Sequence, residues 1–242
     1  MNDFVVLCVD FLVSIISTIF FWRFLLADYD SLGGWSLAGL VLIGIFGNAS
    51  WAVGELFAGS WGLSDKIIEG KFDKYMCRPV NALLATVLED MQVEEMIKGM
   101  LSLVILLVWH KIRFHIQVIA VDLLFALVSF ALGIVIVAVV RSIYSCCAFW
   151  FENTSGFHYL IHMEDLEFDR YPLNIFNKAT RIVLISIIPV GFVSYFPAMF
   201  YMHMINYRMY YILFETVILA MLMLLLHFIW KRGVKRYEAT GG

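Results

Sequence analysis

The sequence predicts an all-α membrane protein, and the composition, the hydropathy and the length of the apolar runs are the observations behind this prediction. Of the 242 residues, 62% are hydrophobic and only 15% are charged, whereas soluble domains are about half apolar and about a quarter charged. The mean hydropathy is +0.85. Apolar runs of about 20 residues suit spanning helices, because lipid offers an open backbone no hydrogen-bond partners. The runs do not alternate as the strands of a β-barrel would.

The apolar runs predict six spans, whichever of two candidates forms the fifth. The first run has no basic region before it and no small-residue cleavage site, so we expect a retained span rather than a signal peptide. We expect Arg141 to end the fourth span. In chain order the predicted spans are residues 4–26, 35–58, 96–110, 116–140, either 142–168 or 182–200, and 210–230.

Two segments compete for the fifth span. Residues 182–200 are the more apolar, but they contain Pro189 and Pro197, and proline removes a backbone donor and bends a helix. Residues 142–168 are long enough to cross, yet several of their side chains are polar and would have to face protein or water. The residues alone leave both candidates open.

Basic residues predict the orientation in the membrane. They gather in the long polar connection, residues 59–95, and in the tail after the last span. With six crossings these two regions share a side, and their excess of Lys and Arg predicts that this side and both termini are cytoplasmic. Lys111 and Arg113, in the loop after the third span, count against this orientation.

The polar connection has a helical pattern of its own. Residues 63–76 carry apolar side chains at three- and four-residue steps, which predicts one amphipathic helix. Pro79 ends it, because the residue before a proline is biased away from the helical region. Asn81, an N-cap type of residue, predicts a second helix toward Glu89. Such a segment lies in the lipid headgroup layer or docks a cytoplasmic partner.

Four stretches, in the same order along the chain, resemble the permeases of type 2 ABC exporters. The first has an ile-x-x-gly-x-(leu/phe)-asp run before arg-pro-val, and the third has a tyr-pro … ile-pro … pro-ala pattern. Each is weak alone, and their common order makes the signal specific. The stretches are "SDKIIEGKFDKYMCRPVNALL", "GGWSLAGLVLIGIF", "FDRYPLNIFNKATRIVLISIIPVGFVSYFPAMF" and "WKRGVKRYEATGG".

The resemblance implies a permease that pairs with an identical or a related permease in the bacterial cytoplasmic (inner) membrane and exports a substrate. It also implies a separate ABC ATPase, in two copies per complex, that binds ATP and Mg. The chain has no GxxxxGK[ST] phosphate loop, so we expect it to have no ATPase site, no cofactor and no enzymatic activity of its own. The other expected contact is membrane lipid, and the absence of a polybasic tract argues against nucleic acid.

By the same resemblance, the connection between the second and third spans is a coupling helix that sits in a groove of the ATPase. Phe72 and Tyr75 are then expected as aromatic anchors and Arg78 as a charge-assisted partner. Movement of the coupling helix would pass to the second and third spans. The expected contact residues are Ile67, Ile68, Gly70, Phe72, Asp73, Tyr75, Arg78 and Pro79.

The resemblance bears on the fifth span as well. Related exporters have a short re-entrant hairpin before the last span, and Pro172, Pro189 and Pro197 match its proline pattern. This favours the hairpin there and a fifth span at residues 142–168, whereas hydropathy favours the opposite. Unlike the family, the chain has no evident amphipathic helix before its first span.

Polar residues in the fifth-span region raise other functions. Glu152, Asn153 and His158 are candidates for lining a translocation path if that segment crosses, and otherwise belong to a loop at the membrane edge. His158 and His162 would share a helix face and offer two metal ligands, but the HExxH pattern is missing and we predict no metal site. Two rival functions stay open: an intramembrane metal-dependent enzyme, and a scaffold or ion-driven carrier without an ATPase.

Acidic residues lie near the ends of several predicted spans, and small residues form a pattern in the second span. Four acidic residues fall near span ends, where a carboxylate can reach the headgroups, so we expect them at the membrane interface: Asp10, Glu55, Asp122 and Glu215. Small residues recur four apart in the second span and let another helix approach closely. That helix belongs either to this chain or to a second copy. The small residues are Ser50, Gly54 and Ala58.

Overall fold

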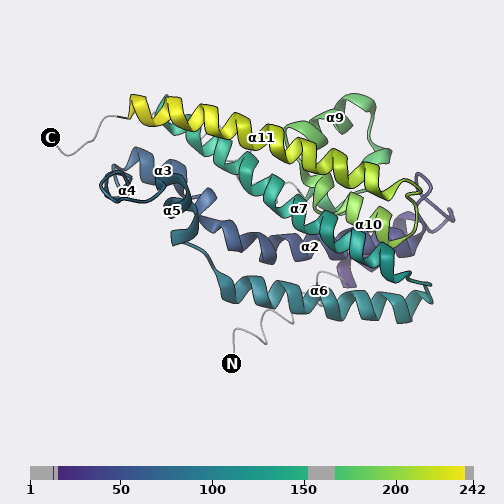
Figure 1. Ribbon diagram of the computed structural model, residues 1–242. Coiled ribbons are helices and arrows are strands. Elements are labelled where there is room, and N and C mark those ends of the chain that lie inside the picture. The colour runs from purple at the N-terminus through teal and green to yellow at the C-terminus, as the bar shows by residue number, and fades with distance from the viewer. Residues whose placement is uncertain (1–12, 14–15, 152–166, 238–242) are drawn as a thin grey trace.

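The computed structural model describes residues 13, 16–151 and 167–237, and in this part of the chain helices are joined by short loops (Figure 1). The α-helices are Ile16–Leu25, α2 (Leu37–Gly54), α3 (Leu63–Ile68), α4 (Asp73–Met76), α5 (Ala82–Glu89), α6 (Val93–Phe114), α7 (Ala120–Ser145), α9 (Lys178–Ser186), α10 (Tyr195–Tyr201) and α11 (Arg208–Arg236). The 3₁₀ helices are η1 (Glu55–Ser60), η2 (Cys146–Phe149), η4 (Phe168–Arg170), η5 (Leu173–Ile175) and η6 (Val190–Phe192).

Helix α2 is the buried centre of the bundle. It runs beside α6, and α7 and α10 also pack on it (Figure 1). The Ser36 hydroxyl accepts a hydrogen bond from the Gly39 N–H and caps its first turn. In the stretch Leu37–Ile68, 72% of the most apolar window is buried, compared with 11% in α11. We infer that α11 presents most of its apolar surface to the outside of this chain.

Helix α6 has favourable charges at both of its ends. Glu94 and Glu95 lie in its first turn, and Lys111 and Arg113 lie in its last turn, which is the arrangement that the helix dipole favours. His115 follows with φ 52°, in the left-handed region where helices commonly end. The helix therefore extends beyond the predicted third span at both ends.

Helix α7 corrects the predicted end of the fourth span. Instead of ending at Arg141, it continues through Ser145 into η2. Arg141 is only 7% exposed, and its guanidinium carbon lies 4.9 Å from the centre of the Trp61 ring. The protein accommodates this charge, so the helix does not have to end at the headgroups. The first residues of the candidate fifth span at 142–168 belong instead to α7 and η2. Most of the remaining residues of that candidate lie outside the described residues.

The proline-rich candidate for the fifth span or the hairpin is a bent pair of helical segments. Lys178–Ser186 and Val190–Tyr201 meet at an angle of 77°. Pro172 and Pro189 stand directly before η5 and η6, and Pro197 lies in the first turn of α10, where a missing N–H donor is tolerated. A broken span and a re-entrant hairpin both fit this bend, so the choice between them stays a prediction.

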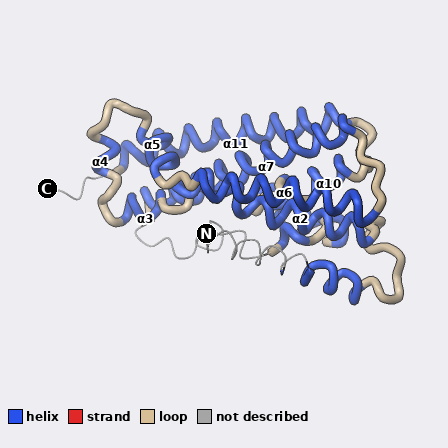
Figure 2. Tube along the Cα trace, turned by 90° about the horizontal axis from the view of Figure 1, so that it is seen from below, coloured by secondary structure: helices blue, strands red, loops and turns tan. Residues whose placement is uncertain are grey.

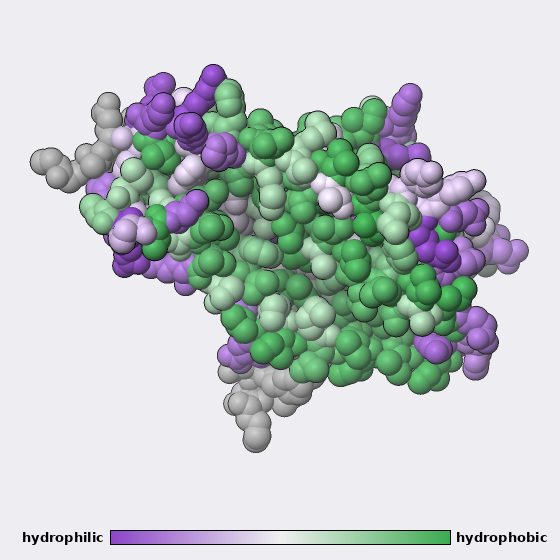
Figure 3. All heavy atoms as spheres, viewed as in Figure 1, coloured by the Kyte–Doolittle hydropathy of each residue, from purple (hydrophilic) through white to green (hydrophobic). Residues whose placement is uncertain are grey.

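Hydropathy along the fold identifies a membrane protein. Among the described residues, three helical stretches are long and apolar enough to cross a bilayer, and the bent pair counts as a fourth if it is one span. Hydrophobic side chains cover the middle of the molecule, and hydrophilic ones gather at its two ends (Figure 3). The total of six spans stays a prediction. The three stretches are Leu37–Ile68, Ala120–Phe149 and Arg208–Arg236.

Asp10 lies outside the described residues, and the side chains of Glu55, Asp122 and Glu215 face the protein rather than the headgroups. Their exposed fractions are 8%, 1% and 0%. Asp122 accepts a hydrogen bond from Arg208 and contacts His203 at 2.6 Å, which joins the start of α7 to the start of α11. Glu215 also has a partner inside the protein, because the Ser129 hydroxyl donates to it over 2.7 Å.

Candidate functional site

The polar end that carries α3, α4 and α5 also holds the ends of α7 and α11. Both views place these elements together at one end of the long helices (Figures 1 and 2). Their apolar side chains form one buried cluster that includes Ile67, Phe72, Cys146, Phe149 and Leu226. We refer to residues 59–95 as the coupling segment.

A glycine bend divides residues 63–76 of the coupling segment into two short helices. The single amphipathic helix predicted over residues 63–76 is wrong, because α3 ends at Ile68 and α4 begins at Asp73. Between them Gly70 has φ 72°, a conformation in which a side chain would be strained. The chain turns back so that the Phe72 N–H donates to the Lys66 carbonyl over 2.9 Å. This turn points Phe72 into the protein.

Phe72 is the centre of an aromatic cluster between three elements. Its ring centroid lies 5.8 Å from that of Phe149, 5.6 Å from that of Trp230 and 5.2 Å from that of Tyr237. All three pairs are edge-to-face, the geometry that ring quadrupoles favour. The cluster therefore ties the coupling segment to the end of α7 and to the last turns of α11.

Gly233 lets α11 approach this cluster. A Cβ atom at Gly233 would lie 2.2 Å from Cδ2 of Phe149, far inside van der Waals contact. Only a residue without a side chain allows the α11 backbone to lie directly on the Phe149 ring. The glycine in the basic tail is thus a packing residue of the site.

A hydrogen bond reinforces the ring contacts. The Tyr237 hydroxyl donates to Oδ1 of Asp73 over 2.7 Å. Burial, followed by this hydrogen bond and by the negative charge of Asp73, raises the pKa of Tyr237 to about 12. The phenol is therefore neutral and able to donate at every physiological pH. We call Phe72, Asp73, Phe149, Trp230 and Tyr237 the clamp.

Helix α5 supports the other side of the coupling segment. It begins after Asn81, whose side chain accepts from the N–H groups of the next turn, so the predicted N-cap is confirmed. Lys66 lies 2.5 Å from Asp90, and Lys74 lies 2.8 Å from Glu89. These ion pairs join α3 and α4 to the end of α5. Each contributes little by itself because its partners are partly exposed.

Burial corrects the roles expected of the two aromatic residues. Phe72 and Tyr75 are 0% and 1% exposed, so neither is available as an anchor for another protein. Ile67 is buried as well, at 5%. The glycine bend separates residues that a continuous helix would have placed on one face. Between Ile68 and Val80 the exposed residues are Ile68, Glu69, Lys71, Lys74, Met76, Cys77, Arg78, Pro79 and Val80.

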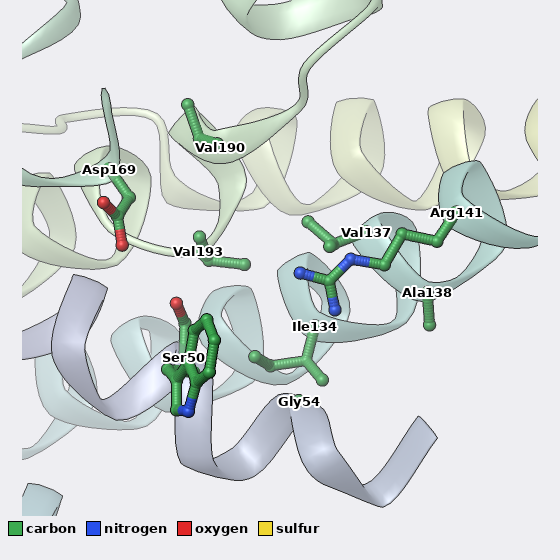
Figure 4. Close-up of a pocket in the computed structure, with 10 residues that line it drawn as sticks. Ser50, Gly54, Ile134, Val137, Ala138, Arg141, Asp169, Val190 and Val193 are labelled. Atoms are coloured by element: carbon green, nitrogen blue, oxygen red, sulfur yellow. The ribbon is translucent and has the colours of Figure 1, made fainter. Parts of the chain in front are cut away.

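A small cavity lies deeper in the bundle, beside the predicted small-residue face of α2. Ser50 and Gly54 of α2 line it together with Arg141 of α7, whose guanidinium extends into the space between the helices (Figure 4). Its volume is about 30 Å³, room for a water molecule but not for a substrate. Ser50 and Gly54 therefore face other elements of this chain, and a role of the small residues in pairing with a second copy stays a prediction.

The candidates for the translocation path cannot be placed. Glu152, Asn153 and His158 lie outside the described residues. In the described ranges, no group of three or more His, Cys, Asp or Glu side chains is arranged to hold a metal ion. The polar end with its clamp is thus the candidate site that the described residues support best.

Comparison with known proteins identifies the family. The family described as "ABC-2 family transporter protein" matches residues 12–241. The chain belongs to this ABC-2 family. The match spans the coupling segment, the bent pair and the clamp, and it agrees with the resemblance to ABC exporter permeases. Searches among curated proteins and among solved structures found no match.

Membership of the ABC-2 family assigns the chain a class of function. It is a membrane-spanning permease of an ABC transporter, and the family implies an ABC ATPase subunit as its partner. The ABC-2 assignment favours transport over the rival of a metal-dependent enzyme, because the permease subunit is not itself catalytic.

Sequence reasoning missed most of the clamp. The sequence indicates the position and the charge of the coupling segment, but Phe149, Trp230 and Tyr237 stand in apolar runs or in the basic tail, where nothing local marks them as contacts of that segment. One signal was available: Trp230, Gly233 and Tyr237 recur at three- and four-residue steps, which places them on one face of a helix.

Proposed function

We propose that the chain is the permease subunit of an ATP-driven exporter and that the exposed side of its coupling segment docks a separate ATPase. The observation that carries this proposal is the clamp, which fixes a short polar segment between the ends of two long apolar helices. A segment held in this way can pass a displacement to the helices that hold it, because closely packed side chains transmit strain.

The docking surface consists of the exposed residues of the coupling segment. Ile68, Met76 and Val80 are 40%, 46% and 55% exposed, and Arg78 and Pro79 are exposed beside them. Exposed apolar side chains and an arginine are residue types that protein interfaces commonly bury. Phe72, Tyr75 and Ile67 position this surface from behind.

The complex contains two ATPase subunits, which bind ATP and Mg, and two permeases, identical or related. ATP binding draws the ATPases together, and each displaces the coupling segment that it holds. The clamp passes this displacement to α7 and α11, in addition to α2 and α6, which are continuous with the segment along the chain. The pathway opens to the outside as these helices shift.

The coupling segment and the tail face the cytoplasm of a bacterial cell, and the complex resides in its inner membrane. Support comes from their basic residues, which the fold gathers at one end of the molecule. The bent pair before α11 acts as the re-entrant hairpin on the opposite side, where irregular backbone at membrane depth is buried by protein.

Co-purification tests the docking surface. An ATPase encoded beside this chain would be expressed with it, and the ATPase retained on tagged permease would be measured. Met76→Glu with Arg78→Glu is expected to lose the ATPase, because both side chains are exposed and their replacement reverses the character of the surface. Arg113→Glu, an exposed site at the opposite polar end, is the matched control. Equal retention of the ATPase by wild type, by the double variant and by Arg113→Glu would overturn the proposal.

A further inference from the structure

A basic groove lies between the last turns of α11 and the end of α7. Its volume is about 690 Å³, within the range of about 300–1,000 Å³ that is usual for ligand sites. Arg232, Lys235 and Arg236 line it together with the aromatic rings of Trp150 and Phe228. The groove is separate from the exposed residues of the coupling segment.

Among the described residues, the cations of the groove have no acidic partner. Arg232, Lys235 and Arg236 take part in no ion pair within the part of the chain that the structure describes, and none of the described lining residues is acidic. Phe228, Arg232 and Arg236 are spaced by four residues and so lie along one stripe of α11. The Arg232 guanidinium carbon lies 4.0 Å from the centre of the Phe228 ring, which holds the charge in place.

The position of the groove in the fold indicates which anion fits. It lies where two apolar stretches end, Ala120–Phe149 and Arg208–Arg236, and we expect the ends of spanning stretches at the level of the lipid headgroups. Tryptophan is enriched at this level because its ring is amphipathic, and basic pockets between spanning helices bind anionic headgroups. Arginine matches a phosphate group with paired N–H donors.

We propose that this groove is a binding site for an anionic phospholipid, with the headgroup phosphate on Arg232, Lys235 and Arg236 and the acyl chains along Phe228. Trp150 forms the wall on the α7 side, and its ring packs edge-to-face on Phe149 at 6.2 Å. A bound lipid therefore braces the clamp from outside. This last consequence rests on the proposed function, whereas lipid binding itself does not.

Native mass spectrometry of the purified full-length chain tests the site. The protein would be titrated with phosphatidylglycerol, which carries a net negative charge, and with phosphatidylcholine, which carries a phosphate but no net charge. We expect one phosphatidylglycerol to bind more tightly than any phosphatidylcholine. Arg232→Gln with Arg236→Gln should weaken that binding by about fivefold for each cation removed, the factor expected for one basic residue at an anionic lipid surface.

Matched variants separate the groove from general basicity. Lys231→Gln removes one positive charge, as each of the arginine substitutions does, from an exposed position on the same helix that does not line the groove, and it should leave the affinity unchanged. Phe228→Leu keeps the apolar surface but removes the ring under Arg232, and it should weaken binding even if the arginine variants fold poorly. An equal loss in Lys231→Gln, or equal affinity for the two lipids, would overturn the proposal.

The same titration distinguishes a lipid from a soluble phosphate. With inorganic phosphate added in excess, phosphatidylglycerol is expected to stay bound, because its acyl chains add apolar contact to the charged contact. Displacement of the lipid by phosphate would show that the groove selects the anion alone, and it would reject the assignment to a phospholipid.

Discussion

The hydroxyl of Tyr237 donates a 2.7 Å hydrogen bond to Asp73, across 164 residues of chain. One partner directly follows the last helix, and the other begins α4 in the coupling segment. Together with the rings around Phe72, this bond makes the end of α11 and the coupling segment one packed unit. Force applied to the segment therefore reaches α11 without passing through the intervening chain.

Tyr237→Phe should lower the free energy of unfolding by about 1 kcal/mol, the usual net value of one hydrogen bond, because the ring and its packing are retained. Denaturant titration of the detergent-solubilised chain measures the change. In a double-mutant cycle with Asp73→Ala, the two effects should be non-additive. Strict additivity would mean that the bond does not form in the folded protein.

The contribution of this hydrogen bond to the free energy of unfolding should not vary between about pH 6 and about pH 9. The folded-state pKa of Tyr237, about 12, lies above the unfolded value of about 10. The stabilisation is therefore complete below about pH 10 and is lost as the pH rises through about 12. The difference in free energy of unfolding between wild type and Tyr237→Phe would be measured at several pH values. A decrease of this difference near neutral pH would contradict the prediction.

Phe72→Ala should destabilise the protein by about 3–5 kcal/mol, because it leaves a cavity among Phe149, Trp230 and Tyr237. Met76→Ala, four residues away and 46% exposed, should change stability by no more than about 0.5 kcal/mol. Thermal unfolding of the two variants side by side makes the comparison. Similar losses in both would show that Phe72 is not buried in the clamp.

Gly233→Ala should lower the free energy of unfolding, measured by denaturant titration, by about 1–3 kcal/mol, the range for overpacking. The reason is that its Cβ would lie 2.2 Å from the Phe149 ring. The control is Gly62→Ala, where a Cβ meets its nearest neighbour at an ordinary 3.7 Å. Phe149→Leu should partly rescue Gly233→Ala by making room. If the smaller residue gives no rescue, the close approach of α11 to Phe149 is not the cause.

The sequence predicted the membrane class, the place of the coupling segment and the helix after Asn81, because hydropathy and capping are local properties. Gly70 was a candidate for a close approach or a bend, but the sequence still predicted one helix over residues 63–76, since a glycine in a helical pattern is compatible with continuation. The sequence also did not predict that α7 passes Arg141, because the ring of Trp61 comes from a distant part of the chain.

The same reasoning explains the error about Phe72 and Tyr75. An amphipathic stripe identifies an apolar face but does not identify what covers it. In this protein the covering residues are Phe149, Trp230 and Tyr237, which lie far along the chain. The exposed contact residues therefore had to be read from the fold.

Labelling of Cys77 with a maleimide tests the central claim most directly. This thiol is free and exposed, and it lies between Met76 and Arg78 in the proposed docking surface. The account predicts that labelling is fast in the permease alone and slows sharply in the complex with the ATPase, with Cys77→Ser as the blank. Labelling at the same rate in the intact complex would contradict docking at the coupling segment.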